Sequence, residues 1–258
     1  MGPDDLLRVA LGPGARGCFT TRGAGAPPVT PADPYAGFNL AAHVGDDPKR
    51  VERHRRLLAG ALELAADDIG WMAQVHSAVV ATARRGRTPT ADALVVECRD
   101  PWAPRAAGVL VADCVPVLLA TDDGALVAAV HAGRRGMLDG VVPRALAAFA
   151  ARGARAGDVW AAIGPAVCGA CYEVPEEMRR AAAEIEPECA ATTRWGTPGL
   201  DVAAGVRAQL GRAGVTRIAG GPWCTAEDRR FFSYRRDGTT GRIAGIVVTR
   251  ACQAVTEA

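Results

Sequence analysis

The chain has 258 residues, of which 49% are hydrophobic and 22% are charged, and this is enough to bury one sizeable core. Its formal net charge of +2 leaves no basic excess that would drive binding to nucleic acid or to an anionic membrane. No basic stretch followed by a long apolar one marks a signal peptide, and aspartates interrupt the longest apolar runs before they reach membrane-spanning length. We therefore expect a soluble cytoplasmic protein, and the length alone permits one domain or two small ones.

The N-terminal part of the chain predicts a loop followed by one amphipathic helix. Proline and glycine punctuate the loop over residues 23–37. The helix is expected to begin near Pro48, because an aspartate cap precedes the proline and His54 and Leu58 then fall on one apolar face. On that face, a hydrogen-bonded packing role suits His54 better than a role as a ligand.

Short β-type runs dominate the middle of the chain. The runs are WMAQVH, AVVAT, ALVVE, GVLVA, VPVLLAT, ALVAAVH, DVWAAIG and, near the C-terminus, IAGIVVT. Further helices are expected from about Val141, in VPEEMRRAAAEI, and in DVAAGVRAQLGRAG, where Gly214 ends the helix. Consecutive strands over residues 71–131 predict an α/β fold in which helices pack outside a mixed sheet. A turn at Asp237-Gly238 predicts a hairpin near the C-terminal end.

Two histidines and one cysteine stand at or inside these β-type runs. His76 closes WMAQVH, Cys114 interrupts VLVADCVPVLLA, and His131 closes ALVAAVH. Because strand pairing brings distant residues together, two imidazoles and a thiolate there would form a three-ligand zinc site with an open fourth position. The alternative is three unrelated core residues, since their spacing matches no compact zinc signature. Asp113, beside the thiol, is expected on the opposite face of a regular strand.

The other cysteines carry a weaker signal. Eight cysteines scattered over a long chain without an export signal favour reduced thiols over a disulfide framework. Cys168 and Cys171 form a CxxC, but a zinc ribbon needs a second such pair and the sequence has none. We therefore interpret Cys168 and Cys171 as small buried thiols near a turn.

Several segments, in order along the chain, carry a resemblance to one family. They are FNLAAHVGDDP, QVH, ADAL, ADCVPVLL, AAVHAGRRG, AIGP, CYEV and RFFSYRRDGTTGR. Over residues 18–248 the chain resembles the family variously called multicopper polyphenol oxidase (laccase)-like, peptidoglycan editing factor or laccase-domain purine nucleoside phosphorylase. The resemblance implies one domain over residues 1–258, folded as a single four-layer α/β/β/α sandwich with a mixed sheet core, and a small-molecule substrate. We expect a monomer or homodimer. It also implies that His76, Cys114 and His131 are the metal ligands and the catalytic residues.

The resemblance assigns substrate contacts to Asn39, His43, Arg55 and Arg135. Asn39 and His43 lie in the FNL…HVGDD segment, where hydrogen bonding within a loop is the alternative. Arg55 keeps the basic residue of the family's Asn-Arg pair, although a histidine replaces the asparagine. The family's HAGWRG reads HAGRRG here, so Arg134 replaces a tryptophan while Arg135 keeps the basic position.

Three functional classes are compatible with these residues. The first, implied by the resemblance, is a zinc enzyme that phosphorolyses adenosine, inosine and methylthioadenosine and deaminates adenosine, with Arg55 and Arg135 clamping phosphate. Asp92, Asp113 and Glu173 are candidates for its acid or base. The second is a copper-dependent phenol oxidase. Laccase chemistry needs roughly ten histidines around several coppers, whereas this chain has four, so this class is left with a single copper ion and weak oxidation. The third is a peptidoglycan-precursor editing hydrolase with Cys114 as nucleophile.

Overall fold

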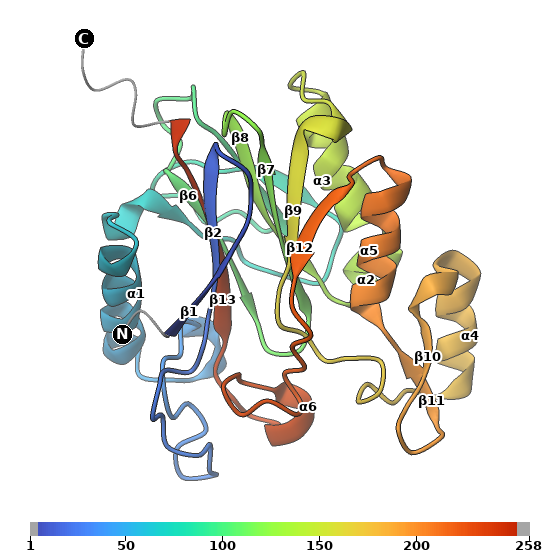
Figure 1. The fold of residues 1–258 in the computed structure, drawn as a ribbon. Coiled ribbons are helices and arrows are strands. Elements are labelled where there is room, and N and C mark those ends of the chain that lie inside the picture. Colours follow the sequence, from blue (N-terminus) through green and yellow to red (C-terminus); the bar gives the residue numbers. More distant parts are fainter. Residues whose placement is uncertain (1–4, 252–258) are drawn as a thin grey trace.

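The computed structural model describes residues 5–251, and its strands assemble into two large sheets and a small one (Figure 1). The strands are β1 (Leu6–Val9), β2 (Ala15–Thr20), β3 (Ile69–Gly70), β4 (Val80–Thr82), β5 (Ala93–Glu97), β6 (Ala106–Val111), β7 (Val115–Thr121), β8 (Leu126–Ala132), β9 (Val159–Ile163), β10 (Ala190–Thr192), β11 (Pro198–Leu200), β12 (Arg217–Gly220) and β13 (Ile243–Thr249). One large sheet has the order β1-β2-β13-β6-β3 and the other the order β12-β9-β7-β8-β5-β4, while β10 pairs with β11. Both large sheets combine parallel and antiparallel pairs, so both are mixed.

The α-helices of the described residues are α1 (Pro48–Ala61), α2 (Arg134–Leu138), α3 (Val141–Ala150), α4 (Glu176–Ile185), α5 (Val202–Arg212) and α6 (Tyr234–Asp237), and short 3-10 turns cover Ala42–Val44, Ala66–Asp68, Ala156–Asp158 and Pro187–Cys189. The predicted starts at Pro48 and Val141 are confirmed. At the first of them, the Asp47 side chain accepts a hydrogen bond from the backbone N–H of Lys49 at 2.9 Å. The helix α2, directly after the HAG segment, is not predicted by the sequence pattern.

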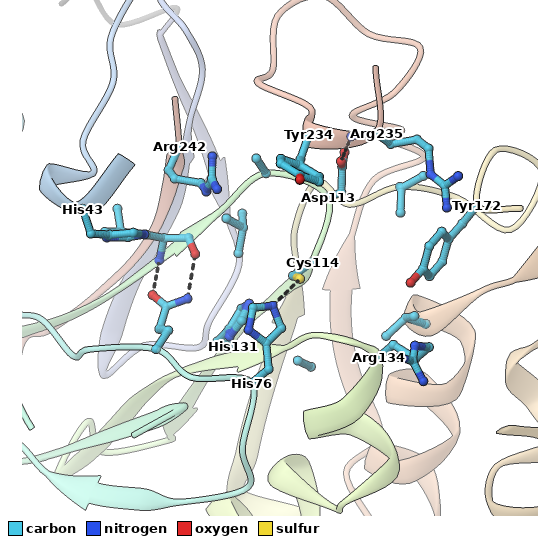
Figure 2. Close-up of a pocket in the computed structure, with 17 residues that line it drawn as sticks. His43, His76, Asp113, Cys114, His131, Arg134, Tyr172, Tyr234, Arg235 and Arg242 are labelled. Carbon is cyan, nitrogen blue, oxygen red and sulfur yellow. Dashed lines mark hydrogen bonds between the residues drawn. The ribbon is translucent and has the colours of Figure 1, made fainter. Parts of the chain in front are cut away.

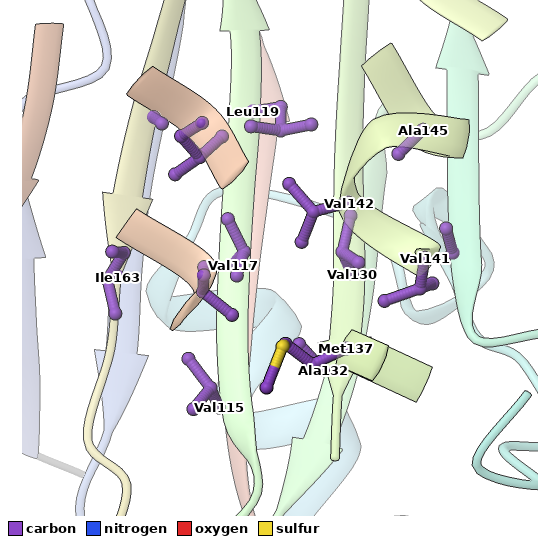
Figure 3. Close-up of a cluster of buried hydrophobic side chains, with 14 of the residues drawn as sticks. Val115, Val117, Leu119, Val130, Ala132, Met137, Val141, Val142, Ala145 and Ile163 are labelled. Atoms are coloured by element: carbon purple, nitrogen blue, oxygen red, sulfur yellow. The ribbon is translucent and has the colours of Figure 1, made fainter. Parts of the chain in front are cut away.

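Three hydrophobic clusters stack these elements into four layers. Between the two large sheets, Phe19 of β2 packs in one cluster with Leu118 of β7. On the outer face of the five-stranded sheet, Leu58 of α1 packs in a second cluster. On the outer face of the six-stranded sheet, a third cluster joins α2, α3 and α5 to β7 and β8, with Met137 and Val142 among its members (Figure 3). The order of layers is therefore α/β/β/α, as the sequence resemblance implies.

The pairing of three strands brings chemically active residues to one end of the six-stranded sheet. Strands β7 and β8 are antiparallel, with Pro116 opposite His131, so Cys114 just before β7 lies near the end of β8. Strand β5 is the other antiparallel neighbour of β8, so Asp92, just before β5, falls at the same end. A thiol, an imidazole and a carboxylate therefore meet there although they are far apart in the sequence.

The predicted strand WMAQVH is wrong. Strand β3 ends at Gly70, and the segment that follows forms only an isolated bridge at Ala73. The Asp92 carboxylate accepts hydrogen bonds from the backbone N–H groups of His76 and Ser77 at 3.0 and 2.7 Å. Because a side chain satisfies these donors, the segment needs no neighbouring strand and is free to bend.

The predicted hairpin at Asp237-Gly238 is also wrong. Residues Tyr234–Asp237 form α6, and the Ser233 side chain caps this helix by accepting from the backbone N–H of Arg236 at 3.2 Å. Gly238 follows with a positive φ of 67°, so the Asp-Gly pair ends a helix here rather than joining two strands.

Two expectations drawn from composition can be compared with the described residues. None of the helices in residues 5–251 combines the length and apolar character needed to cross a bilayer. The thiols of Cys18, Cys114, Cys168, Cys171, Cys189 and Cys224 are free, as expected. Cys98 is disulfide-bonded, so the prediction of reduced thiols is wrong at that position.

Candidate metal centre and cavity

Three side chains from separate segments converge beside a cavity (Figure 2). His76 comes from the irregular segment after β3, Cys114 from the residue before β7, and His131 from β8. The atoms through which they could bind a metal all lie within 4.8 Å of one another, and His76 Nε2 is 3.6 Å from Cys114 Sγ. The two imidazole rings meet edge to face, with 4.7 Å between centroids. The structure therefore brings together the three residues that the sequence singles out.

A buried carboxylate, Asp92, orients this group. Its Oδ1 lies 2.8 Å from His131 Nδ1, and its Oδ2 accepts hydrogen bonds from the backbone N–H and the hydroxyl of Ser77, both at 2.7 Å. Because Asp92 engages Nδ1, His131 is left with Nε2 for a ligand, an arrangement typical of metal-bound histidines. The Asp92 side chain has no solvent exposure, so its position suits orientation of His131 better than the acid or base role considered from the sequence.

The thiol of Cys114 and the imidazole of His131 shift each other's pKa. Burial alone would raise the pKa of Cys114, but hydrogen bonds and positive charge from His131 and His76 lower this pKa to about 6. Burial alone would lower the pKa of His131, but its hydrogen bonds with Asp92 and Cys114 raise this pKa to about 9. Burial also opposes ionisation of Asp92, yet hydrogen bonds from His131 and Ser77 hold its pKa well below the usual range. Without metal, the centre is therefore a thiolate–imidazolium pair beside an ionised carboxylate at neutral pH.

The backbone bends at two positions around the centre. His76 and Asp113 have positive φ values of 61° and 94°, a region that side chains rarely adopt and that is concentrated at functional sites. Asp113 and Cys114 form a bend between β6 and β7, so the predicted opposite orientation of Asp113 is wrong and both residues line the same cavity. The Asp113 carboxylate accepts hydrogen bonds from the Thr225 hydroxyl and the Arg235 backbone N–H, both at 2.6 Å, which hold the bend.

Because Gly133 has no side chain, it leaves room for the side chains of His76 and Cys114. A Cβ atom at this position would lie 2.7 Å from Cδ2 of His76 and 3.1 Å from Sγ of Cys114. We expect Gly133→Ala to displace His76 and to weaken metal binding about tenfold, the lower end of the effect of disturbing groups that orient metal ligands. Gly157→Ala is the control, because its added methyl group would meet nothing within 4 Å. Equal metal affinity of the two purified variants, measured by competition with a chelator, would contradict this prediction.

The cavity has a volume of about 610 Å³, and its wall carries cations and aromatic rings (Figure 2). Arg134, Arg235 and Arg242 line it together with Tyr172 and Tyr234. The guanidinium of Arg235 lies 5.0 Å from the centroid of the Tyr172 ring. The volume is in the range of small-molecule sites, and the lining suits a ligand that has both a flat ring and an anionic group.

Of the predicted substrate contacts, His43 lines this cavity and Asn39 does not. Burial lowers the pKa of His43, with help from the charges of Arg242 and Arg55, so its imidazole is neutral near pH 7. Asn39 is fully buried, and its amide donates to Asp46 at 2.8 Å and accepts from the backbone N–H of Arg242 at 2.8 Å. Asn39 therefore fixes the loop from which Arg242 reaches the cavity.

The structure does not bring the two predicted phosphate-binding arginines to the cavity wall. Arg55 donates through Nε to the carbonyl of Leu40 at 2.9 Å, and its guanidinium lies 4.7 Å from the ring centroid of Trp71. Arg135 is exposed and lies outside the lining, whereas its neighbour Arg134 is part of it. The replacement of the family's tryptophan therefore places a cation in the cavity.

Sequence reasoning assigned no role in the site to several lining residues, which are Gln74, Arg134, Tyr172, Tyr234, Arg235 and Arg242. Each falls inside one of the segments that carry the family resemblance, namely QVH, HAGRRG, CYEV and FFSYRRDGTTGR. The family segments were therefore the only sequence signal for these residues. The arginine-rich segment FFSYRRDGTTGR was predicted to be a hairpin, and a hairpin gives no reason to expect a pocket. Glu173, a candidate acid or base, is exposed and lies outside the lining.

A protein-family model described as multi-copper polyphenol oxidoreductase laccase matches residues 16–250. The chain belongs to this laccase family. Among its relatives, a protein of Streptomyces coelicolor named purine nucleoside phosphorylase is 49% identical over 238 residues, covering 91% of this chain and 95% of the relative. A Corynebacterium glutamicum protein of the same name is 44% identical over 236 residues, covering 90% and 93% of the two chains. The crystal structure of Neisseria meningitidis protein NMB0706 shares the fold, with a TM-score of 0.81, 33% identity, and coverage of 95% of this chain and 99% of that one.

The donor atoms in this member of the laccase family limit which metal centre its described residues could hold. Within residues 5–251 two groups could hold a metal, namely the centre of two histidines and a cysteine and a group of three cysteines with a glutamate. A laccase centre holds several coppers with many histidines, and these groups do not supply them. Two imidazoles and one thiolate, with a carboxylate behind one imidazole, fit a single zinc ion with an open position.

Proposed function

We propose that the chain is a zinc-dependent purine nucleoside phosphorylase that cleaves adenosine, inosine and methylthioadenosine with phosphate. The observation that carries the proposal is the placement of two histidines and a cysteine beside a cavity of about 610 Å³ lined by three arginines and two tyrosines. The names of the relatives, which reach 49% identity, support the same class of reaction.

The residues of the cavity wall supply binding. Arg134 and Arg242 would hold phosphate, because a guanidinium offers paired N–H donors that match two oxygens at once. Tyr172 and Tyr234 offer flat ring faces to a purine. The neutral imidazole of His43 can exchange hydrogen bonds with sugar hydroxyls.

His76, Cys114 and His131 would hold the zinc, and Asp92 would keep His131 in the tautomer that leaves Nε2 free. When bound, zinc supplies Lewis-acid polarisation of a substrate atom or of water. His131 must lose the proton that its raised pKa retains in the metal-free centre, so zinc loading at neutral pH releases a proton from this residue. The proposal extends to adenosine deamination, which uses water in place of phosphate.

The test is an assay on protein purified without a histidine tag and loaded with zinc. Adenosine with phosphate should give free adenine and ribose 1-phosphate, and adenosine without phosphate should give inosine, both resolved by chromatography. A chelator should abolish both reactions and zinc should restore them. Recovery with copper but not with zinc would contradict the metal assignment, and the absence of product from adenosine, inosine and methylthioadenosine would end the proposal.

A thiol hydrolase acting on peptidoglycan precursors is the second candidate, because the metal-free centre carries a cysteine thiolate. The pKa of about 6 at Cys114, caused by His131 and His76, is typical of nucleophilic cysteines. The two candidates respond differently to metal removal. A thiol hydrolase would keep its activity in chelator, whereas the phosphorylase would lose it. Alkylation does not separate the candidates, because both need Cys114.

The adjacent arginines of HAGRRG provide a matched test of phosphate binding. Arg134→Gln should lower phosphorolysis about tenfold, because a charge-assisted contact contributes about 1.5–3 kcal/mol and this residue is only partly buried. Arg135→Gln should leave the rate unchanged, because Arg135 lies outside the cavity. Deamination should fall less than phosphorolysis in Arg134→Gln. Equal losses in the two arginine variants would show that general charge, and not a contact in the cavity, explains the effect.

A further inference from the structure

A second group of potential metal ligands lies on loops beside the cavity wall. Cys168 and Cys171 occupy the segment between β9 and α4, while Cys224 and Glu227 lie between β12 and α6. One atom of each side chain, a sulfur or a carboxylate oxygen, lies within 4.8 Å of the equivalent atoms of the other three. The sequence lacks a second CxxC, but the tertiary structure brings two further potential ligands from a segment more than fifty residues away.

Hydrogen-bond donors point at the sulfur atoms of this group. The backbone N–H of Cys168 donates to Cys224 Sγ at 3.5 Å, and Arg194 Nη2 donates to Cys171 Sγ at 3.1 Å. Arg194 also forms an ion pair with Glu227. All three thiols are free. Burial and the neighbouring thiols raise the pKa of Cys168 and of Cys171, the latter to about 12, so both are protonated without metal and would release their protons on binding it.

We propose that Cys168, Cys171, Cys224 and Glu227 form a second, structural zinc site. Four protein ligands close a tetrahedral zinc shell, whereas the centre of His76, Cys114 and His131 has three and leaves a position open. Three thiolates select a soft or borderline metal over magnesium or calcium. The Arg194 guanidinium is a positioning residue that orients Glu227 and offsets the negative charge of the ligands.

The site would brace one wall of the cavity. Beside Cys168, Val167 donates its backbone N–H to the carbonyl of Asp113 at 3.0 Å. Beside Cys224, Thr225 donates its hydroxyl to the Asp113 carboxylate at 2.6 Å. These contacts hold the bend that carries Cys114, and Tyr172, which follows Cys171, lines the cavity. The local hydrophobic cluster is small, with only Val167, Cys171 and Cys224 as its buried members, so a metal ion would add the cross-link that packing does not provide.

Zinc stoichiometry tests the proposal and does not depend on the proposed activity. The full-length protein, loaded with zinc and freed of excess, should hold two ions per chain. Cys114→Ser should hold one, Cys224→Ser should hold one, and the double variant should hold none. In cobalt-substituted protein, absorption from thiolate-to-metal charge transfer should persist in Cys114→Ser, which retains three thiolates at the second site. The same absorption should fall strongly in Cys224→Ser.

Stability measurements test the second site even if Cys224→Ser folds poorly. In Cys114→Ser, where only the second site remains, a chelator should lower the unfolding midpoint and zinc should restore it. Glu227→Gln should weaken this response, because it keeps the shape of an exposed side chain and removes its charge. Cys189→Ala is the control, since this buried thiol belongs to neither group. Absence of zinc from loaded Cys114→Ser, or iron in place of zinc at the second site, would overturn the proposal.

Discussion

Cys114→Ser is expected to lose zinc from the cavity and to lower nucleoside phosphorolysis by at least about a hundredfold. The thiolate exists at neutral pH because His131 and His76 lower the pKa of Cys114 to about 6, and a serine hydroxyl does not ionise in this way. Zinc would then have two imidazoles and no anionic ligand, and the several kcal/mol of transition-state stabilisation that a Lewis acid provides would be lost. Zinc content and steady-state turnover of the purified variant measure both effects.

Cys18→Ser is the matched control for this prediction. Cys18 is a buried free thiol outside both groups of potential metal ligands, so its substitution should change zinc content and turnover little. The expected change in Cys114→Ser is the loss of one zinc ion per chain and not of all zinc, because the second site retains its own ligands. Full zinc content together with normal turnover would show that Cys114 is neither a ligand nor a nucleophile.

Asp92→Asn is expected to weaken zinc binding and to lower turnover by tenfold to a hundredfold, the usual effect of removing a carboxylate behind a metal-bound histidine. Asparagine keeps the size of the side chain but removes the charge that faces Nδ1 of His131 at 2.8 Å. In the metal-free protein the same change should lower the pKa of His131, since Asp92 helps to raise it to about 9. The weakened imidazolium should then let the pKa of Cys114 rise above about 6.

The sign of this shift can be measured by following thiolate absorbance against pH in metal-free protein. The wild-type thiolate should persist down to about pH 6, whereas the Asp92→Asn thiolate should disappear at higher pH. Asp68→Asn is the control, because Asp68 is a buried carboxylate that pairs with Arg85 and lies outside the metal centre. A thermal unfolding scan separates a general loss of stability from the specific effect. An unchanged thiolate titration and unchanged zinc affinity in Asp92→Asn would refute the orienting role.

The sequence by itself predicted the elements whose signals are local. Asp47 and Pro48 start α1, and the apolar runs over residues 93–97 and 243–249 are strands, because caps and hydrophobic periodicity act within a few residues. Polar residues that can bind metal stand out against apolar strands, so the pattern also suggested His76, Cys114 and His131 as one group, with three unrelated core residues as the alternative. The family resemblance decided between the two, because it implies that all three are metal ligands.

Only the tertiary structure decided which polar groups surround these residues. The segment before His76 bends because Asp92, a residue more than a dozen positions away, accepts its backbone hydrogen bonds in place of a strand. Arg134 lines the cavity and Arg135 does not, because both lie in α2 and successive helical residues point about 100° apart. Cys168 and Cys171 meet Cys224 through packing of distant loops. Local sequence patterns cannot specify such meetings, because long-range contacts depend on how whole elements pack.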